Sequence, residues 1–198
     1  MQLVLATRNQ DKVREIKAAL KGLPVEILTL PKATTGKLKE TGQTLEQNAL
    51  QKARTVFNMT GLPCLADDTG LEVNYLNGAP GVRSSRYAGN QASYLENNLK
   101  LLKKLQGVPL RNRKARFRCV LALVLNQDQH YLVEASVSGL IARERRGLSG
   151  FGYDPVFYLP RFKQTFAQMT LREKNKISHR GKALRRLRRL LARLIPGS

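Results

Sequence analysis

Two adjacent carboxylates, Asp67 and Asp68, are the side chains in this sequence best suited to bind a metal ion. They follow an apolar run over 63–66 that predicts a short buried strand, and Gly70 comes shortly after them. Carboxylate oxygens are hard ligands of the kind that Mg²⁺ and Mn²⁺ prefer. Acidic residues are scarce, 14 against 35 Lys and Arg, which weakens the alternative of a merely solvated acidic turn. Glu40, in a polar segment upstream, could supply a further carboxylate.

A polar loop near the start of the chain is a candidate for anion binding. Residues 2–6 predict a buried strand, and the apolar spacing over 11–20 predicts a helix. Thr7, Asn9 and Lys12 lie where the strand passes into the helix, so that backbone N–H groups and polar side chains could converge on a phosphate. The segment lacks the glycine pattern of a P-loop, so it does not by itself establish a triphosphate site.

Two further segments could recognise a base. Phe151-Gly152-Tyr153-Asp154 offers aromatic faces for stacking and a carboxylate for a polar edge, although aromatic residues near glycine also serve in simple packing. Ser178-His179-Arg180 places a hydroxyl, an imidazole and a guanidinium side by side at a predicted helix start. These groups could hydrogen-bond carbonyl or phosphate oxygens. No Ser/His/Asp or Cys/His arrangement for covalent catalysis is apparent in the sequence.

The hydrophobic pattern predicts an α/β scaffold for these residues. A second strand is expected over 25–30, and the polar stretch over 32–42 is interpreted as a loop. Thr44 and Gln47 form the pattern of a capping box before a helix that should end near Gly61. The remaining predicted elements are a helix over 94–105, a hairpin of strands over 115–126 and 131–138, a short strand over 155–158 and a helix from 178 onward.

Length and composition predict a globular protein. A chain of 198 residues, 42% of them hydrophobic, fits one large domain or one domain with a small lobe. Residues 1–7 form a short apolar run without a basic segment before it, which is typical of neither a signal peptide nor a membrane span. Cys64 and Cys119 lie in separate apolar runs, so we expect two buried thiols in a reducing, cytoplasmic environment.

The formal net charge of +21 would attract any polyanion, whether nucleic acid, acidic membrane or a phosphorylated small molecule. Glu173 is the only acidic residue after Met169, while Arg and Lys crowd residues 180–193. A nucleic-acid-binding protein, with this basic tail as its working surface, is therefore a rival prediction. The sequence shows no helix-turn-helix, zinc-finger or aromatic RNA-binding signature, which argues against that rival as the main function.

Taken together and in order, the segments resemble the inosine triphosphate pyrophosphatase family, which removes non-standard purine nucleoside triphosphates. The matching segments are Leu3-Val4-Leu5-Ala6-Thr7-x-Asn9-x-x-Lys12, Glu40-Thr41-Gly42, Asn48 with Lys52, Ala66-Asp67-Asp68-Thr69-Gly70-Leu71, Gly78-Ala79-Pro80-Gly81, Ser85-Arg86-Tyr87, Gly150-Phe151-Gly152-Tyr153-Asp154-Pro155, Glu173-Lys174 and Ile177-Ser178-His179-Arg180-Gly181. They are spread over nearly the whole chain, and their joint order is far more specific than any one of them.

The resemblance implies a single α/β domain over 1–198 with an elongated mixed sheet, flanking helices and two lobes with the active-site cleft between them. It also implies a homodimer that does not contact a membrane. The implied reaction is hydrolysis of ITP, dITP and XTP between the α and β phosphates, giving the monophosphate and pyrophosphate with the help of Mg²⁺ or Mn²⁺. Such an enzyme cleanses the nucleotide pool and keeps these bases out of DNA and RNA. A nucleotide pyrophosphatase for modified pyrimidines stays an alternative.

The resemblance also assigns roles to residues. The substrate's phosphates would be held by Thr7, Arg8, Asn9, Gln10, Asp11, Lys12 and Lys52, with Thr69 also placed among the substrate-binding residues. Glu40, Asp67 and Asp68 would hold the metal and the attacking water, with Asp68 as general base, although which of the two aspartates is ligand and which is base stays open. The base would be surrounded by Phe151, Gly152, Tyr153, Asp154, Lys174, His179 and Arg180, whose donors suit a 6-oxo group and reject a 6-amino purine.

Two positions depart from the family pattern. Arg8 stands where the family usually has a small residue, and Thr69 stands in place of a serine. An extra cation at Arg8 could tighten or crowd the binding of a triphosphate. Thr69 keeps the hydroxyl but is stiffer at χ1. We expect both departures to tune activity without abolishing it.

Overall fold

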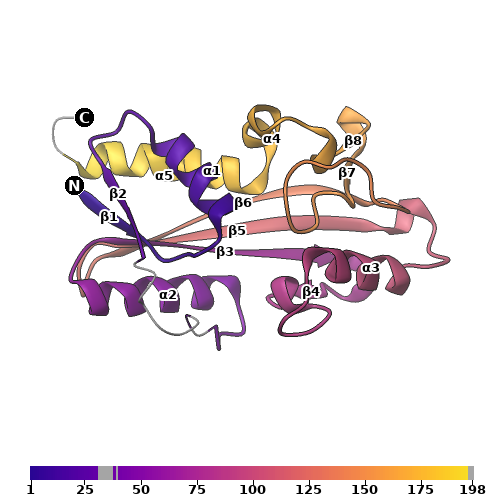
Figure 1. The fold of residues 1–198 in the computed structure, drawn as a ribbon, viewed down its shortest axis with the longest axis horizontal. Helices are drawn as coiled ribbons and strands as arrows, with labels where there is room; N and C mark the ends of the chain where they lie inside the picture. Colours follow the sequence, from indigo (N-terminus) through magenta and orange to yellow (C-terminus); the bar gives the residue numbers. More distant parts are fainter. Residues whose placement is uncertain (31–37, 39, 196–198) are drawn as a thin grey trace. The chain divides into compact units, whose positions relative to one another are not determined.

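The computed structural model describes residues 1–30, 38 and 40–195, so most of the loop predicted over 32–42 lies outside the described residues. The chain has an α/β fold that divides into two compact units (Figure 1). The first unit consists of Met1–Asp68, Cys119–Ala135 and Arg180–Ser198, and the second of Thr69–Arg118 and Ser136–His179. Each unit is thus built from segments far apart in the sequence. The predicted single domain with two lobes stays a prediction.

Parallel strands form the centre of the first unit. β1 (Gln2–Leu5) pairs in parallel with β2 (Glu26–Thr29) and with β3 (Cys64–Val73). The sheet continues from β3 to β5 (Lys114–Val124) and then β6 (His130–Ile141). After its first residue β1 is entirely buried, as expected for a parallel strand that is covered on both faces. The strands predicted over 2–6 and 25–30 are confirmed.

Helices α1 (Gln10–Leu20) and α5 (His179–Leu194) lie on one face of this sheet in the first unit (Figure 1). Their buried leucines, together with those of β1 and β5, form one continuous core. Leu184, Leu187 and Leu191 of α5 are at most 1% exposed, so this side of the helix is buried. Burial of one such side chain contributes about 1.5–3 kcal/mol to folding.

Helix α2 (Leu45–Thr60) lies on the opposite face of the sheet (Figure 1). The capping box predicted from Thr44 and Gln47 is present, because the Thr44 hydroxyl accepts from the Gln47 N–H and the Gln47 side chain accepts from the Thr44 N–H. Gly61 ends the helix in the left-handed conformation with φ 66°, which glycine adopts without strain. Both predicted ends of this helix are confirmed.

The predicted hairpin is formed by β5 and β6, whose connection is closed by a hydrogen bond from the Leu125 N–H to the Gln129 carbonyl at 3.0 Å. The Asn126 side chain accepts from the Asp128 and Gln129 N–H groups and so supports the turn. Both strands run into the second unit, where β6 ends at Ile141, three residues beyond the prediction. The extension is stabilised by antiparallel pairing with β7 (Phe157–Leu159).

The second unit contains the shorter elements. Its core combines aliphatic side chains with a group of aromatic rings, in which the ring centroid of Phe157 lies 4.7 Å from that of Phe117 and 5.2 Å from that of Phe166. The elements of this unit besides β7 and its parts of β3, β5 and β6 are β4 (Pro80–Gly81), β8 (Gln164–Thr165), α3 (Tyr94–Lys104), α4 (Leu171–Ile177) and 3₁₀ helices over Asn74–Leu76, Ser84–Arg86, Leu110–Asn112, Pro160–Phe162 and Phe166–Gln168. The helix predicted over 94–105 is confirmed as α3. Helix α4 is absent from the predicted elements, although Thr170 and Glu173 form a capping box at its start.

In the part of the chain that the structure describes, no helix combines the length and the apolar character that crossing a membrane requires.

Replacement of a core leucine should show how much α5 contributes to the first unit. We expect Leu187→Ala to lower the free energy of unfolding by about 2–5 kcal/mol, because the 0% exposed side chain leaves a cavity among packed leucines. The measurement is chemical denaturation followed by circular dichroism. Arg189→Ala, on the exposed side of the same helix, is the control and should stay within about 0.5 kcal/mol of the original chain. Equal losses in the two variants would contradict the packing described.

Candidate functional site

Asp67 and Asp68 lie inside β3, not after it. The predicted end of this strand at residue 66 is therefore wrong: β3 continues through both aspartates to Val73, and its far part pairs with β4. β1 pairs with β3 only as far as Leu65, so the two carboxylates lie just beyond the carboxyl end of β1. This is the position at which α/β sheets generally place ligand groups.

The two aspartates have different partners because neighbouring residues of a strand point to opposite faces of the sheet. Asp67 contacts side chains of α1 and α5, whereas Asp68 contacts a side chain of α2. These helices lie on opposite faces of the sheet in the first unit (Figure 1). The adjacent carboxylates therefore belong to two separate environments.

Asp68 shares a buried ammonium group with Glu40. Lys52 of α2 donates to Glu40 Oε1 at 2.8 Å, to Asp68 Oδ1 at 2.9 Å and to the Asp67 carbonyl at 3.0 Å. Burial opposes the charged form of Lys52, but the two carboxylates outweigh it and raise the pKa of the ammonium. We call this group the Glu40–Lys52–Asp68 cluster. It brings together three of the residues that the sequence predicts for phosphate, metal and water.

Helix α2 also fixes the segment that carries Glu40. The Gly42 N–H donates to Asn48 Oδ1 at 2.8 Å, and the Thr41 N–H donates to Gln51 Oε1 at 3.2 Å. A Cβ atom on Gly42 would lie 2.6 Å from the Gln47 Cβ, so only glycine allows this close approach. The spacing of Glu40-Thr41-Gly42 and Asn48 is therefore explained by docking of the segment on the first turns of α2. Gln51 is a supporting residue that the sequence does not single out.

The Asp68 carboxylate suits a divalent cation. Its Oδ2 atom is buried and has no hydrogen-bond partner among the described residues, while Oδ1 binds Lys52. Burial raises the pKa of Asp68 above its ordinary value, against the opposing effect of Lys52 and Lys12. Within residues 1–30, 38 and 40–195, no three His, Cys, Asp or Glu side chains form a ready metal cage. Mg²⁺ is commonly held by one or two carboxylates together with substrate phosphates, so Asp68 and Glu40 fit such an ion.

Asp67 is held by basic side chains. Arg180 donates to Asp67 through Nε at 2.8 Å and to Glu15 through Nη1 at 2.8 Å, and Lys12 forms an ion pair with Asp67. Burial alone would raise the pKa of Asp67, but Arg180 and Lys12 outweigh it and hold that pKa well below its usual range. The ionised carboxylate therefore stabilises the fold above the ordinary pKa of an aspartate, and this stabilisation is lost as the pH falls below it. The Cys119 thiol completes the set, with its Sγ 3.3 Å from Asp67 Oδ2.

These contacts place the Arg180 side chain on two carboxylates of the first unit. The sequence predicts instead that Arg180 contacts the base. Glu15 and Cys119 are not among the predicted site residues. Glu15 falls in the polar part of the helical pattern of α1, and Cys119 lies in an apolar strand, so neither position carries a sequence signal of its own. Both residues are buried, at 2% and 0% exposure.

The loop before α1 is organised around the first helical turn. Asn9 caps the helix, accepting from the N–H groups of Asp11 and Lys12 at 2.9 and 3.2 Å, and Thr7 accepts from the Asn9 N–H at 3.2 Å. Asp11 pairs with Arg14 on the surface. Arg8 and Gln10 are exposed, and the Gln10 side chain donates to the Arg8 carbonyl. The loop thus offers two features for binding an anion, which are the N-terminus of α1 and the half-buried ammonium group of Lys12.

The second unit brings together the predicted base-binding segment. Lys174 of α4 donates to Asp154 Oδ2 at 2.7 Å, and both side chains are buried. The same ammonium lies 4.5 Å from the centre of the Phe151 ring, and the Phe151 N–H donates to Asp154 at 2.9 Å. Gly150 has φ 76°, and a Cβ atom there would lie 2.2 Å from Asp154 Oδ2. The segment is therefore shaped around the Asp154 carboxylate.

Of the remaining predicted residues of this unit, Tyr153 and His179 are buried. The Tyr153 hydroxyl donates to the Ser84 carbonyl at 2.9 Å, and Asn98 donates to the Gly152 carbonyl at 2.8 Å. The His179 imidazole stacks on Phe117 with ring centroids 4.4 Å apart. Thr69, the first residue of this unit, is half-buried in β3. Asn98 is a supporting residue missing from the sequence prediction.

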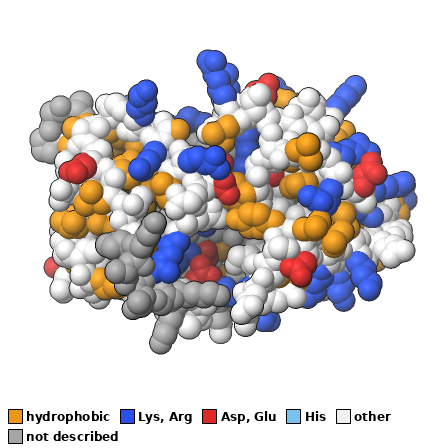
Figure 2. Space-filling view, in the orientation of Figure 1, with side chains coloured by type: hydrophobic (Ala, Val, Ile, Leu, Met, Phe, Trp, Pro, Cys, Tyr) orange, Lys and Arg blue, Asp and Glu red, His pale blue; other side chains and the backbone are white. Residues whose placement is uncertain are grey.

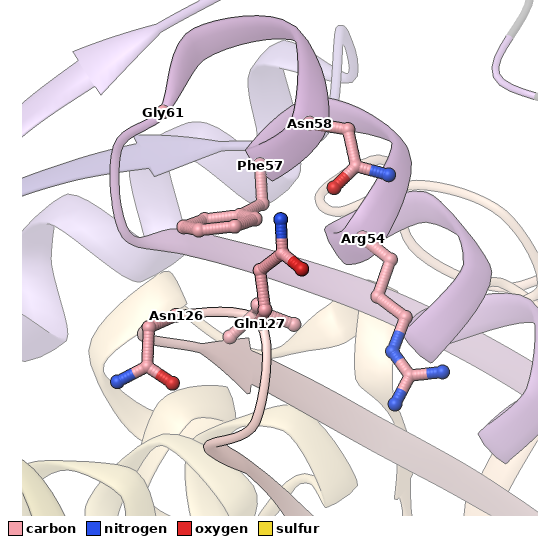
Figure 3. A pocket seen from close by; sticks show the side chains of 7 residues that line it. Arg54, Phe57, Asn58, Gly61, Asn126 and Gln127 are labelled. Carbon is pink, nitrogen blue, oxygen red and sulfur yellow. The ribbon is translucent and has the colours of Figure 1, made fainter.

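A hollow of about 470 Å³ lies at the end of α2 beside the β5–β6 turn (Figure 3). It contains no acidic side chain and none of the predicted site residues, so it has no place in the chemistry described above. It is lined by Arg54, Phe57, Asn58, Gly61, Val124, Asn126 and Gln127.

Known proteins match this chain over nearly its full length. The family model of the Ham1 family matches residues 3–190. A dITP/XTP pyrophosphatase of Bacillus licheniformis is 50% identical over 192 residues, which is 96% of this chain and 97% of that protein. A dITP/XTP pyrophosphatase of Desulforamulus reducens is 47% identical over 197 residues, covering 98% of this chain and 97% of that protein.

Solved structures agree. A HAM1 protein from Coxiella burnetii has a TM-score of 0.90 and 42% identity, covering 98% of this chain and 99% of that one. The Ham1 protein of Staphylococcus aureus has a TM-score of 0.88 and 36% identity, covering 98% and 100%. The predicted family resemblance and the α/β fold are both confirmed, and the chain belongs to the Ham1 family.

Proposed function

We propose that this protein hydrolyses non-standard purine nucleoside triphosphates, dITP, XTP and ITP, to the monophosphate and pyrophosphate with a divalent metal. The observation that carries the proposal is the Glu40–Lys52–Asp68 cluster, in which one buried lysine binds two carboxylates and an oxygen of Asp68 stays available. The near full-length relatives that are dITP/XTP pyrophosphatases support the same reaction and substrate class. A buried cluster of this composition has no evident purpose in a protein that acts only through a basic surface.

Lys12 and Lys52 are the side chains that handle the phosphates. Both ammonium groups contact the Asp67 carbonyl, at 3.3 and 3.0 Å, so the backbone of β3 holds them near each other. Positive charge placed there neutralises the charge that builds up on the pyrophosphate leaving group. The N-terminus of α1, capped by Asn9, adds its dipole to this attraction.

Asp68 orients the attacking water and accepts its proton. Its Oδ2 atom is buried and accepts no hydrogen bond from the described residues, so it is available to the water. Glu40 and Asp68 would hold Mg²⁺, which would supply charge neutralisation at the phosphates and acidify water. The water oxygen attacks the α phosphorus, and the bond to the bridging oxygen of the β phosphate breaks. Asp67, committed to Arg180 and Lys12, positions these groups without reacting.

The second unit supplies recognition of the base. Phe151 offers a half-buried ring for stacking, and Lys174 lies next to it as a hydrogen-bond donor. A donor suits the 6-oxo group of hypoxanthine or xanthine and meets another donor in the 6-amino group of adenine. Asp154 holds Lys174 in place through their ion pair. Substrate choice therefore depends on the Asp154–Lys174 pair and on the Phe151 ring.

A panel of substrates tests the reaction itself. We expect pyrophosphate release from ITP, XTP and dITP in the presence of Mg²⁺, and release at least tenfold slower from ATP, whose 6-amino group meets the Lys174 donor. Chelation of the metal should abolish the release, because the negative charge on the phosphates is then left to the lysines alone. Absence of release from every substrate, with a folded protein, would overturn the proposal.

The role of Asp68 is tested by a change that keeps its size. Asp68→Asn should lower kcat by about 10²-fold or more, because the amide cannot accept the proton of the water. Asp128→Asn, in the exposed β5–β6 turn, is the matched control and should keep the original rate. Circular dichroism checks that both variants are folded. A near-normal rate in Asp68→Asn would remove this residue from the catalytic role.

Stacking on Phe151 should appear in the kinetics of substrate binding. We expect Phe151→Ala to lower kcat/KM for ITP by about 5- to 150-fold, mostly through KM, since stacking on an aromatic ring contributes about 1–3 kcal/mol per base. Phe162→Ala removes an exposed phenylalanine of the same unit and serves as control. Equal kinetics in the two variants would show that the base does not rest on Phe151.

A further inference from the structure

The exposed side of α5 carries a row of basic side chains that the proposed reaction does not use. Their spacing of three and four residues places them along one side of the helix, opposite the buried Leu184, Leu187 and Leu191. All are exposed except Lys182, which is half-buried. We call this row the basic stripe, and its members are Lys182, Arg185, Arg186, Arg189 and Arg193.

The other two basic residues of α5 have structural tasks. Arg180 is buried on Asp67 and Glu15, and Arg188 donates to the carbonyl groups of Ala19 and Lys21 at 3.0 and 2.8 Å. Arg188 thereby ties α5 to the end of α1. Within the basic stripe, Arg186 donates to the Glu134 carbonyl of β6.

Helix stability does not account for the stripe. Cations are favoured in the last turn of a helix, where Arg193 lies, but Lys182 and Arg185 lie in the first half, near the positive end of the dipole. Like charges four residues apart repel, as at Arg185 with Arg189 and Arg189 with Arg193. A face that is merely solvated usually mixes both signs, whereas α5 contains no acidic residue.

Neighbouring cations extend the surface. Lys17 of α1 and Lys21, the residue after this helix, are exposed, and the Lys21 carbonyl accepts a hydrogen bond from Arg188. Lys and Arg also outnumber Asp and Glu on the face drawn in Figure 2. A large polyanion that approaches the basic stripe would meet several positive charges at once.

We propose that the basic stripe binds the phosphate backbone of double-stranded nucleic acid. From Lys182 to Arg193 the helix rises about 16 Å at 1.5 Å per residue. One strand of a duplex presents a phosphate every 3.4 Å along its axis, so the stripe spans about five of them. Four of its five members are arginines, whose planar guanidinium groups bind phosphate oxygens in pairs.

The structure favours a duplex over other polyanions. A membrane-surface helix inserts an apolar face into lipid, but the apolar face of α5 is buried in the core of the first unit. Single strands are usually held by aromatic side chains that stack on bases, and the basic stripe contains none. Binding through the backbone alone is independent of sequence and strongest where phosphate density is highest.

Fluorescence anisotropy with a short labelled DNA duplex, at salt concentrations between about 50 and 200 mM, tests the proposal. We expect Arg185→Gln/Arg189→Gln/Arg193→Gln to weaken binding at least tenfold and to reduce the slope of log K against log salt by about three, one for each lost phosphate contact. Pyrophosphate release from ITP should be unchanged in this variant. That readout separates the proposal from the proposed function and shows that the variant is folded.

The matched control removes the same charge from the second unit. Lys103→Gln/Lys104→Gln/Arg111→Gln changes three exposed cations and should bind the duplex within about twofold of the original chain. Equal weakening in the two triple variants would overturn the proposal, because net charge alone would then explain the binding. Tighter binding to a single strand of equal length, or to vesicles of acidic phospholipid, would overturn the choice of duplex. Failure of the original chain to bind at the lowest salt would overturn it altogether.

Discussion

A buried ion pair between Asp67 and Arg180 makes the chemistry of the first unit possible. The Asp67 side chain is 0% exposed within β3, and an unpaired charge at such a position would cost several kcal/mol. Arg180, itself 2% exposed, forms ion pairs with both Asp67 and Glu15. Because Arg180 and Lys12 together compensate the buried carboxylates, Asp67 can lie inside β3. The position of Asp68 in β3 therefore depends on Arg180, a residue of α5.

The same ion pair separates structural from chemical roles. With the Asp67 carboxylate fixed on one face of the sheet, its carbonyl receives both Lys12 and Lys52, and the next side chain points to the other face. Lys52 is thereby aligned between Glu40 and Asp68. The two adjacent aspartates look equivalent in the sequence, but the pKa of Asp67 is depressed by its cations, whereas burial raises that of Asp68. The environment of Asp68 favours a carboxylate that must accept a proton.

Much of the fold could be predicted from local signals, and the site could be predicted only in part. The capping box at Thr44, the glycine end at Gly61 and the β5–β6 turn depend on residues within a few positions of each other. The interior position of Asp67 depends on Arg180, 113 residues away, and charged residues followed by glycine normally indicate the end of a strand. The order of the motifs identified the members of the site, but it could not show on which face of the sheet each side chain lies.

Buried charges balance within the described residues. Four acidic side chains, Glu15, Asp67, Asp68 and Asp154, and four basic ones, Lys52, Arg113, Lys174 and Arg180, are buried. The whole excess of +21 therefore belongs to the remaining residues, outside this buried set. Surface charge acts over about 8–10 Å before salt screens it, so it governs how anions approach. The chemistry at Asp68 is set instead by contacts of about 3 Å, which salt screens far less. The rate at which the protein meets phosphates and the rate of turnover therefore depend on different sets of residues.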